Sequence, residues 1–138
     1  MTHVQGLRAA AAAAAAAVLL GACGGGGGGP ALSHAQLVAR AGGLCRDART
    51  KATNLNPSSP DYIQKAIAQA EDLVRQLSGL TPSPADADSY MTMLDAFDKA
   101  IADVGQGDFK DAAAQQTTFV HAADRLGLSD CTNAALGG

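Results

Sequence analysis

The sequence predicts an all-α protein that folds as an antiparallel (up-down) four-helix bundle over residues 32–134. Four stretches of this segment carry apolar side chains at intervals of three and four, which is the spacing of one helix face. Short breaks that contain proline or glycine separate the stretches, and short connections favour antiparallel neighbours. No window sustains an alternation of apolar and polar residues, so we expect no sheet.

The first helix is expected to begin after Ser33, because Ser33 and Gln36 have the spacing of a capping box. The segment Asn54-Leu55-Asn56-Pro57 ends this helix. The Gly42-Gly43 pair is unusual in its middle, since each glycine costs a helix up to about 1 kcal/mol relative to alanine. Either a neighbouring helix packs closely against the pair, or the helix kinks there. The apolar face of this helix is Leu37, Val38, Ala41, Leu44, Cys45 and Ala48.

The next two helices have similar start signals. Ser59-Pro60-Asp61 and Ser83-Pro84-Ala85-Asp86 each place a proline at the first helical position, where its missing N–H costs little. We expect Gly79 to end the second helix in a left-handed conformation. The faces expected in the core are Ile63, Ile67, Ala70, Val74 and Leu77 in the second helix, and Tyr90, Met93, Leu94, Phe97, Ile101 and Val104 in the third.

The fourth helix follows a break at Gly105-Gln106-Gly107, with Asp108 as its N-cap and Gly127 as its stop. Its expected core residues are Phe109, Ala112, Ala113, Phe119, Val120, Ala123 and Leu126.

The first 22 residues have the organisation of a cleavable signal peptide. Arg8 precedes an apolar run of about a dozen residues, too short to span a membrane, which needs about 20. Leu20-Gly21-Ala22-Cys23 then resembles the lipobox of bacterial lipoproteins. The resemblance implies that the Cys23 thiol receives a diacylglyceryl group, that the signal is cut before Cys23, and that the new amine can be acylated, for example with palmitate. The alternative is an ordinary secreted protein in which Cys23 is a spare thiol.

The cysteine count agrees with lipidation. An odd number of cysteines in an exported chain needs an explanation, and lipidation of Cys23 leaves Cys45 and Cys131 to pair in an oxidising compartment. The disulfide would close a loop of about 85 residues and stabilise the fold by roughly 4 kcal/mol. Cys45 lies about 16 Å along the first helix, however, whereas Cys131 follows the fourth. The tail must fold back, the helices must be staggered, or the first helix must bend at Gly42-Gly43, which is the option we prefer.

The expected organisation is therefore a signal peptide (1–22), a lipidated Cys23 with a glycine-rich linker (23–31), a disulfide-linked helical bundle (32–134) and a flexible tail (135–138). The linker has a reach of roughly 15 Å. After cleavage, nine basic and thirteen acidic side chains remain, a net charge of −4. This acidic balance argues against a nucleic-acid partner.

The bundle also resembles a group of uncharacterised, mostly actinobacterial, exported helical proteins. The matching segments are Leu32 to Ala41 with Leu44-Cys45-Arg46 after it, and Ala122 to Leu128 with Cys131 after it. The resemblance implies a cystine-linked helical domain outside the cytoplasm, and it implies no activity.

Few residues suggest chemistry. His34 and His121 could meet at one end of an antiparallel bundle, with Asp124 one turn after His121, so the three are candidate metal ligands, although surface histidines are the commoner explanation. The aspartates of the third helix alternate with its apolar face, which indicates a solvated surface rather than paired catalytic acids. No catalytic motif stands out, so we expect neither an enzyme nor a cofactor.

These features favour a non-enzymatic lipoprotein of the cell envelope, anchored on the extracytoplasmic face of the membrane and contacting another envelope protein or cell-wall material. The alternative is a carrier that holds an apolar molecule or a metal between its helices. A carrier should contain a pocket of several hundred Å³. An interaction module should have a filled interior and an exposed apolar patch.

Overall fold

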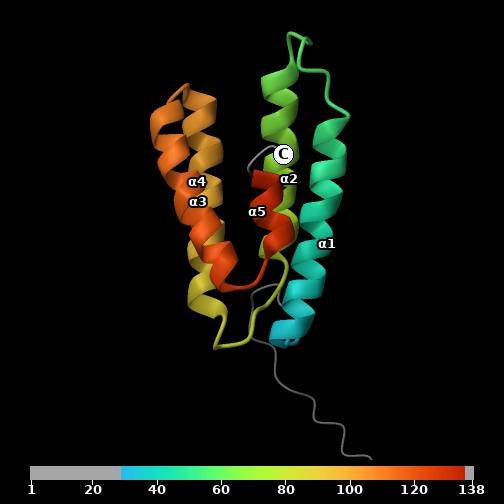
Figure 1. Ribbon diagram of the computed structural model, residues 1–138, viewed down its shortest axis with the longest axis vertical. Helices are drawn as coiled ribbons and strands as arrows, with labels where there is room; N and C mark the ends of the chain where they lie inside the picture. Colours follow the sequence, from blue (N-terminus) through green and yellow to red (C-terminus); the bar gives the residue numbers. More distant parts are fainter. Residues whose placement is uncertain (1–28, 136–138) are drawn as a thin grey trace, which may run out of the picture.

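Five α-helices account for most of residues 29–135, the part of the chain that the computed structural model describes (Figure 1). Their bounds are His34–Thr53 (α1), Tyr62–Ser78 (α2), Ala87–Gln106 (α3), Phe109–Arg125 (α4) and Ser129–Ala135 (α5). The all-α prediction is confirmed, and the packing is that of a four-helix bundle with an additional short helix. None of the helices in the described range is long and apolar enough to cross a membrane.

The long helices form two antiparallel hairpins, α1–α2 and α3–α4, which pack together through α2 and α3 (Figure 1). The fourth side of the bundle is different. In the described chain, no Cα atom of α1 lies within 8 Å of one in α4, and α5 packs against both helices instead. The sequence did not predict α5, which occupies the seam that a regular bundle closes by direct contact.

The helix ends confirm part of the expected capping. The Ser33 hydroxyl accepts from the Gln36 backbone N–H and the Gln36 side chain accepts from the Ser33 backbone N–H, which completes the capping box. The Asp108 carboxylate accepts from the Asp111 N–H at 3.1 Å. Gly107 and Gly127 both have left-handed backbones, with φ of 80° and 70°.

Two expectations about the helix ends were wrong. Gly79 has φ of −75°, so α2 ends in a right-handed turn, closed by a 3.0 Å bond from the Leu80 N–H to the Leu77 carbonyl. Pro60 and Pro84 precede their helices instead of starting them. Each proline lies in a turn closed by a 3.0 Å hydrogen bond, in which a backbone N–H donates to the carbonyl of the serine three residues earlier. The helices begin only after these turns.

The core lies in the lower half of the bundle in Figure 1, where α1, α2 and α3 meet α4 and α5. Tyr90 is fully buried, and its hydroxyl donates to the Leu77 carbonyl at 2.8 Å. Burial raises the pKa of this phenol well above its ordinary value. Other fully buried side chains are Leu37, Ala41, Cys45, Leu77, Met93, Ala122 and Ala123.

At one end of the bundle, two of the side chains that were expected in the core are exposed. Ile63 at the start of α2 is 46% exposed and Phe109 at the start of α4 is 65% exposed, whereas α2 buries Leu73 and Leu77. Both exposed side chains continue a correctly predicted apolar face. Their exposure means that no element of the described chain covers the upper end of those faces.

The chain enters the bundle at the opposite end. The Leu32 N–H donates to the Thr81 carbonyl at 2.8 Å, which fixes the segment before α1 against the connection between α2 and α3. The first turn of α1 is attached to the same connection, because His34 Nδ1 lies 3.0 Å from Asp86 Oδ1. The N-terminal linker therefore meets the domain at the lower end in Figure 1, away from Ile63 and Phe109.

Candidate functional site

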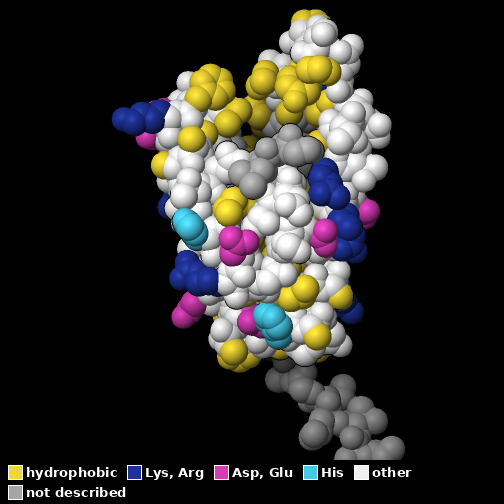
Figure 2. Space-filling model, in the orientation of Figure 1, with side chains coloured by type: hydrophobic (Ala, Val, Ile, Leu, Met, Phe, Trp, Pro, Cys, Tyr) yellow, Lys and Arg dark blue, Asp and Glu magenta, His cyan; other side chains and the backbone are white. Residues whose placement is uncertain are grey.

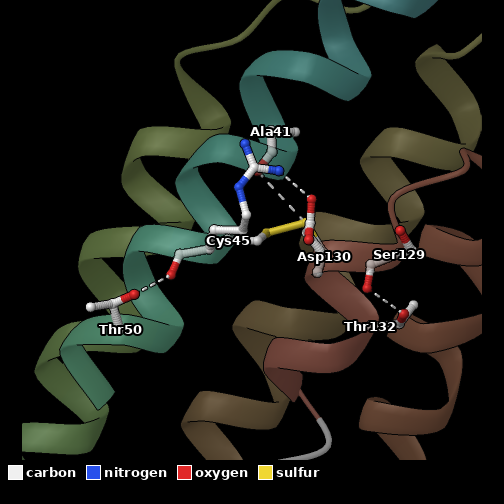
Figure 3. Close-up of polar contacts among 8 residues, drawn as sticks. Ala41, Cys45, Thr50, Ser129, Asp130 and Thr132 are labelled. Carbon is white, nitrogen blue, oxygen red and sulfur yellow. Dashed lines mark hydrogen bonds and ion pairs between the residues drawn. A yellow bond between two sulfur atoms is a disulfide. The ribbon is translucent and has the colours of Figure 1, made fainter. Parts of the chain in front are cut away.

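The disulfide between Cys45 and Cys131 joins α1 to α5, with the two Cα atoms 5.0 Å apart (Figure 3). Gly127 ends α4, and the chain then reverses so that α5 returns along α1. Helix α1 continues without a break through Gly42 and Gly43. The preferred bend in the first helix is therefore wrong, and the folded-back tail brings the two cysteines together.

The close approach of α5 accounts for one of the two unusual glycines. A Cβ atom on Gly42 would lie 3.1 Å from Asp130 Oδ2, a side-chain oxygen of α5. Asp130 also forms an ion pair with Arg46, one turn further along α1 (Figure 3). Gly43 faces more open space, where the nearest atom to an added Cβ would be the Arg46 Nη2 at 3.9 Å. Gly42 is thus the glycine of the pair at which an added side chain would meet α5.

Helix α5 is too short to fill the seam that it occupies. Its 7 residues extend about 10 Å, whereas the 20 residues of α1 extend about 30 Å. Beside α5 a hollow of about 230 Å³ remains, which we call the α5 hollow. Its walls are Cys45, Ala48, Arg49 and Ala52 of α1, Leu55, then Tyr62, Ala66, Gln69, Ala70 and Leu73 of α2, Phe97 of α3, Phe119 of α4, and Cys131 and Ala134 of α5.

The walls of the α5 hollow are mostly alanine, leucine and aromatic carbon, with a few polar groups among them. Gln69 Oε1 is buried and accepts no hydrogen bond from the described residues. A buried carbonyl oxygen without a donor costs about 1–3 kcal/mol. Gln69 also lines a second pocket, between α1 and α2. Arg49 and Tyr62 contribute the other polar side chains.

Phe97 separates the α5 hollow from two neighbouring apolar grooves. One groove lies between α2 and α3 and includes Ile63, and the other lies between α3 and α4 and includes Phe109. The Phe97 ring packs against Phe119 with centroids 4.9 Å apart. Figure 2 shows apolar side chains gathered at this end of the molecule, on both sides of a recess. The exposed Ile63 and Phe109 are therefore part of one apolar region around the hollow.

The structure keeps the candidate metal ligands apart. His34 contacts Asp86, while His121 and Asp124 are exposed on α4. Among the described residues no group of three His, Cys, Asp or Glu side chains could hold a metal ion. The Ser83 hydroxyl donates to Asp86 at 2.9 Å and, together with His34, lowers the pKa of the Asp86 carboxyl. The His34–Asp86 pair thus attaches α1 to the α2–α3 connection.

The predicted lipidation site, Cys23, lies outside the described residues, as do the signal peptide and most of the linker. Comparison of the chain with protein-family models, with curated proteins and with solved structures finds no match. The resemblances to lipoproteins and to actinobacterial exported proteins stay predictions.

Neither Arg49 nor Gln69 was among the site residues predicted from the sequence. A signal for Arg49 was present, because it follows Cys45 by four residues and thus continues the buried face of α1 with a charged side chain. Gln69 directly precedes Ala70 of the predicted apolar face of α2. Polar residues on or beside an apolar face indicate a site only once an unfilled space next to them is known.

Proposed function

We propose that this protein is a membrane-anchored, extracytoplasmic binding lipoprotein that holds a small apolar molecule in the α5 hollow. The observation that carries the proposal is a mostly apolar space of about 230 Å³ beside α5, with apolar grooves next to it. A dry apolar cavity of about 150 Å³ is enough to bind benzene. At about 230 Å³ the hollow is smaller than most ligand pockets, so it suits only a single ring system or a short chain.

The proposed location rests on separate features. The disulfide favours an oxidising compartment. The lipobox-like segment before Cys23 supports a lipid anchor, and two acyl chains suffice for stable attachment. Because the linker meets the bundle at the end opposite to Ile63 and Phe109, an anchored molecule would present its apolar end away from the membrane surface.

A second function, contact with another envelope protein, is supported by the apolar region around the hollow. Ile63 and Phe109 are both exposed to solvent. A partner protein that covers this apolar surface would remove it from water, which is favourable. A partner protein could cover this region while a small molecule occupies the hollow, so the two functions are compatible.

The first experiment isolates the mature protein from its native envelope and measures its mass under denaturing and native conditions. Denaturing mass spectrometry is expected to find acyl groups on the N-terminal Cys23 peptide and an intact Cys45–Cys131 bond. Native mass spectrometry is expected to find an additional small molecule that is lost on unfolding. A mature chain without acyl groups would overturn the proposed anchor.

The second experiment tests the hollow with indole, a neutral ring with one N–H donor. The chain has no tryptophan, so indole fluorescence can be followed without a protein background. We expect saturable binding that the variant Ala70→Leu weakens by about tenfold or more, because added side-chain volume occupies the hollow. The matched control, Ala113→Leu, lines only the α3–α4 groove and should bind as the unmodified protein does. Equal effects of the two substitutions, or no saturable binding, would contradict the proposal.

A further inference from the structure

Arg49 differs from the two basic residues that flank it on the same half of α1. Arg46 forms an ion pair with Asp130, and Lys51 Nζ lies 3.9 Å from Asp72 Oδ2. Arg49 has no carboxylate oxygen within 4.0 Å in the described chain, although it is partly buried and lines the α5 hollow. Its guanidinium is therefore a cation next to an apolar space, with no acidic partner among residues 29–135.

Asp72 and Asp130, the carboxylates that contact the neighbouring basic residues of α1, already have partners. Asp72 contacts Arg75 at 3.2 Å as well as Lys51. Asp130 is taken by Arg46. Removing a charge from water costs free energy unless an opposite charge and hydrogen bonds compensate. A partly buried arginine next to apolar walls therefore favours binding of an anion from outside the protein.

We propose that the ligand of the α5 hollow is an amphipathic acid, with its apolar body in the hollow and its acid group on Arg49. This inference rests on the proposed function. A guanidinium donates two parallel hydrogen bonds to a carboxylate or to another oxyanion, and such charge-assisted pairs are stronger than neutral ones. Arg49 would fix the direction in which the molecule enters.

The experiment compares two probes of similar shape, indole-3-acetate and 3-methylindole. The mature protein is held in lipid nanodiscs, and empty nanodiscs correct for partitioning of the probes into lipid. We expect the acid to bind about tenfold or more tightly than the neutral ring, which corresponds to one charge-assisted interaction. Raising the salt concentration should weaken binding of the acid and leave 3-methylindole unchanged.

The variant Arg49→Gln should remove the preference for the acid and leave the affinity for 3-methylindole within about twofold. Arg49→Lys retains the charge but loses the planar fork, so it should retain only part of the preference. The matched control is Arg40→Gln. Arg40 is an exposed α1 arginine that does not line the hollow, and its substitution changes the net charge equally.

The possible results separate the two proposals. If neither probe binds, the α5 hollow is not a binding site and the proposed function is overturned. If both probes bind equally, or if Arg40→Gln lowers the preference as much as Arg49→Gln does, the hollow is a site but the assignment of Arg49 is wrong. A helix content equal to that of the unmodified protein, measured by circular dichroism, shows that a variant is folded.

Discussion

Alanine at Gly42 and alanine at Gly43 should have different effects on stability, although the two residues are neighbours in the same helix. In the interior of a helix, alanine is favoured over glycine by up to about 1 kcal/mol. At Gly43 the new methyl group has room, since its nearest neighbour is the flexible end of Arg46 at 3.9 Å. We expect Gly43→Ala to raise the free energy of unfolding by about 0.5–1 kcal/mol.

Gly42→Ala has the same intrinsic gain and an opposing cost. Its methyl carbon would lie 3.1 Å from Asp130 Oδ2, inside the 3.4–4 Å of an ordinary contact. The carboxylate must move by a few tenths of an ångström, which disturbs its pair with Arg46, and a pair of this exposure is worth at most about 1 kcal/mol. The two contributions nearly cancel, so we expect Gly42→Ala to change the free energy of unfolding by less than about 0.5 kcal/mol.

The measurement is urea unfolding at neutral pH, followed by circular dichroism with the disulfide intact. A double-mutant cycle identifies the contact, because Asp130→Ala removes the obstructing oxygen. In the Asp130→Ala background, Gly42→Ala should stabilise the protein about as much as Gly43→Ala does. If Gly42→Ala stabilises the unmodified protein as much as Gly43→Ala, helix α5 does not press against α1 at this position and our explanation of the glycine pair is refuted.

Three further changes test other parts of the fold. Replacing Cys45 and Cys131 together by alanine should lower the free energy of unfolding by about 4–5 kcal/mol, measured by urea unfolding, since the bond joins residues 86 apart. Tyr90→Phe should lower it by about 0.5–1.5 kcal/mol in the same assay, because the buried hydroxyl no longer donates to the Leu77 carbonyl. The lowered pKa of Asp86 adds stability above the ordinary carboxyl pKa of about 3.9, which is lost as the pH falls through the lowered value. Melting temperatures between pH 7 and pH 2 should therefore depend less on pH in Asp86→Asn.

The long helices could be predicted because their signals are local. Apolar spacing and caps identified α1 to α4, and the cysteine count identified the Cys45–Cys131 pair. Helix α5 has no such signal. Its 7 residues follow a glycine stop and are too short to show a period, and isolated helices of this length are not stable. Contacts with α1 and α4 keep α5 helical, and such contacts cannot be read from a single sequence.

The candidate site could not be predicted for a related reason. Periodicity identifies which face of a helix is apolar, but it does not say whether another element covers that face. Ile63 and Phe109 were assigned to the core on correct faces and are exposed, because α5 ends before it reaches their level. The α5 hollow results from the difference in length between α5 and the helices around it, and the proposed role of Arg49 depends on that hollow.

The disulfide and the hollow belong to the same structural arrangement. A seven-residue helix contributes few buried side chains to the seam between α1 and α4, chiefly Cys131 and Thr132 together with Leu128 just before it. Such a helix would fray without a covalent bond to α1. Because Cys45 and Cys131 also line the hollow, the bond that retains α5 also fixes one wall of the proposed site. A short helix held by a disulfide can thus leave an apolar space beside it that a longer fifth helix would fill.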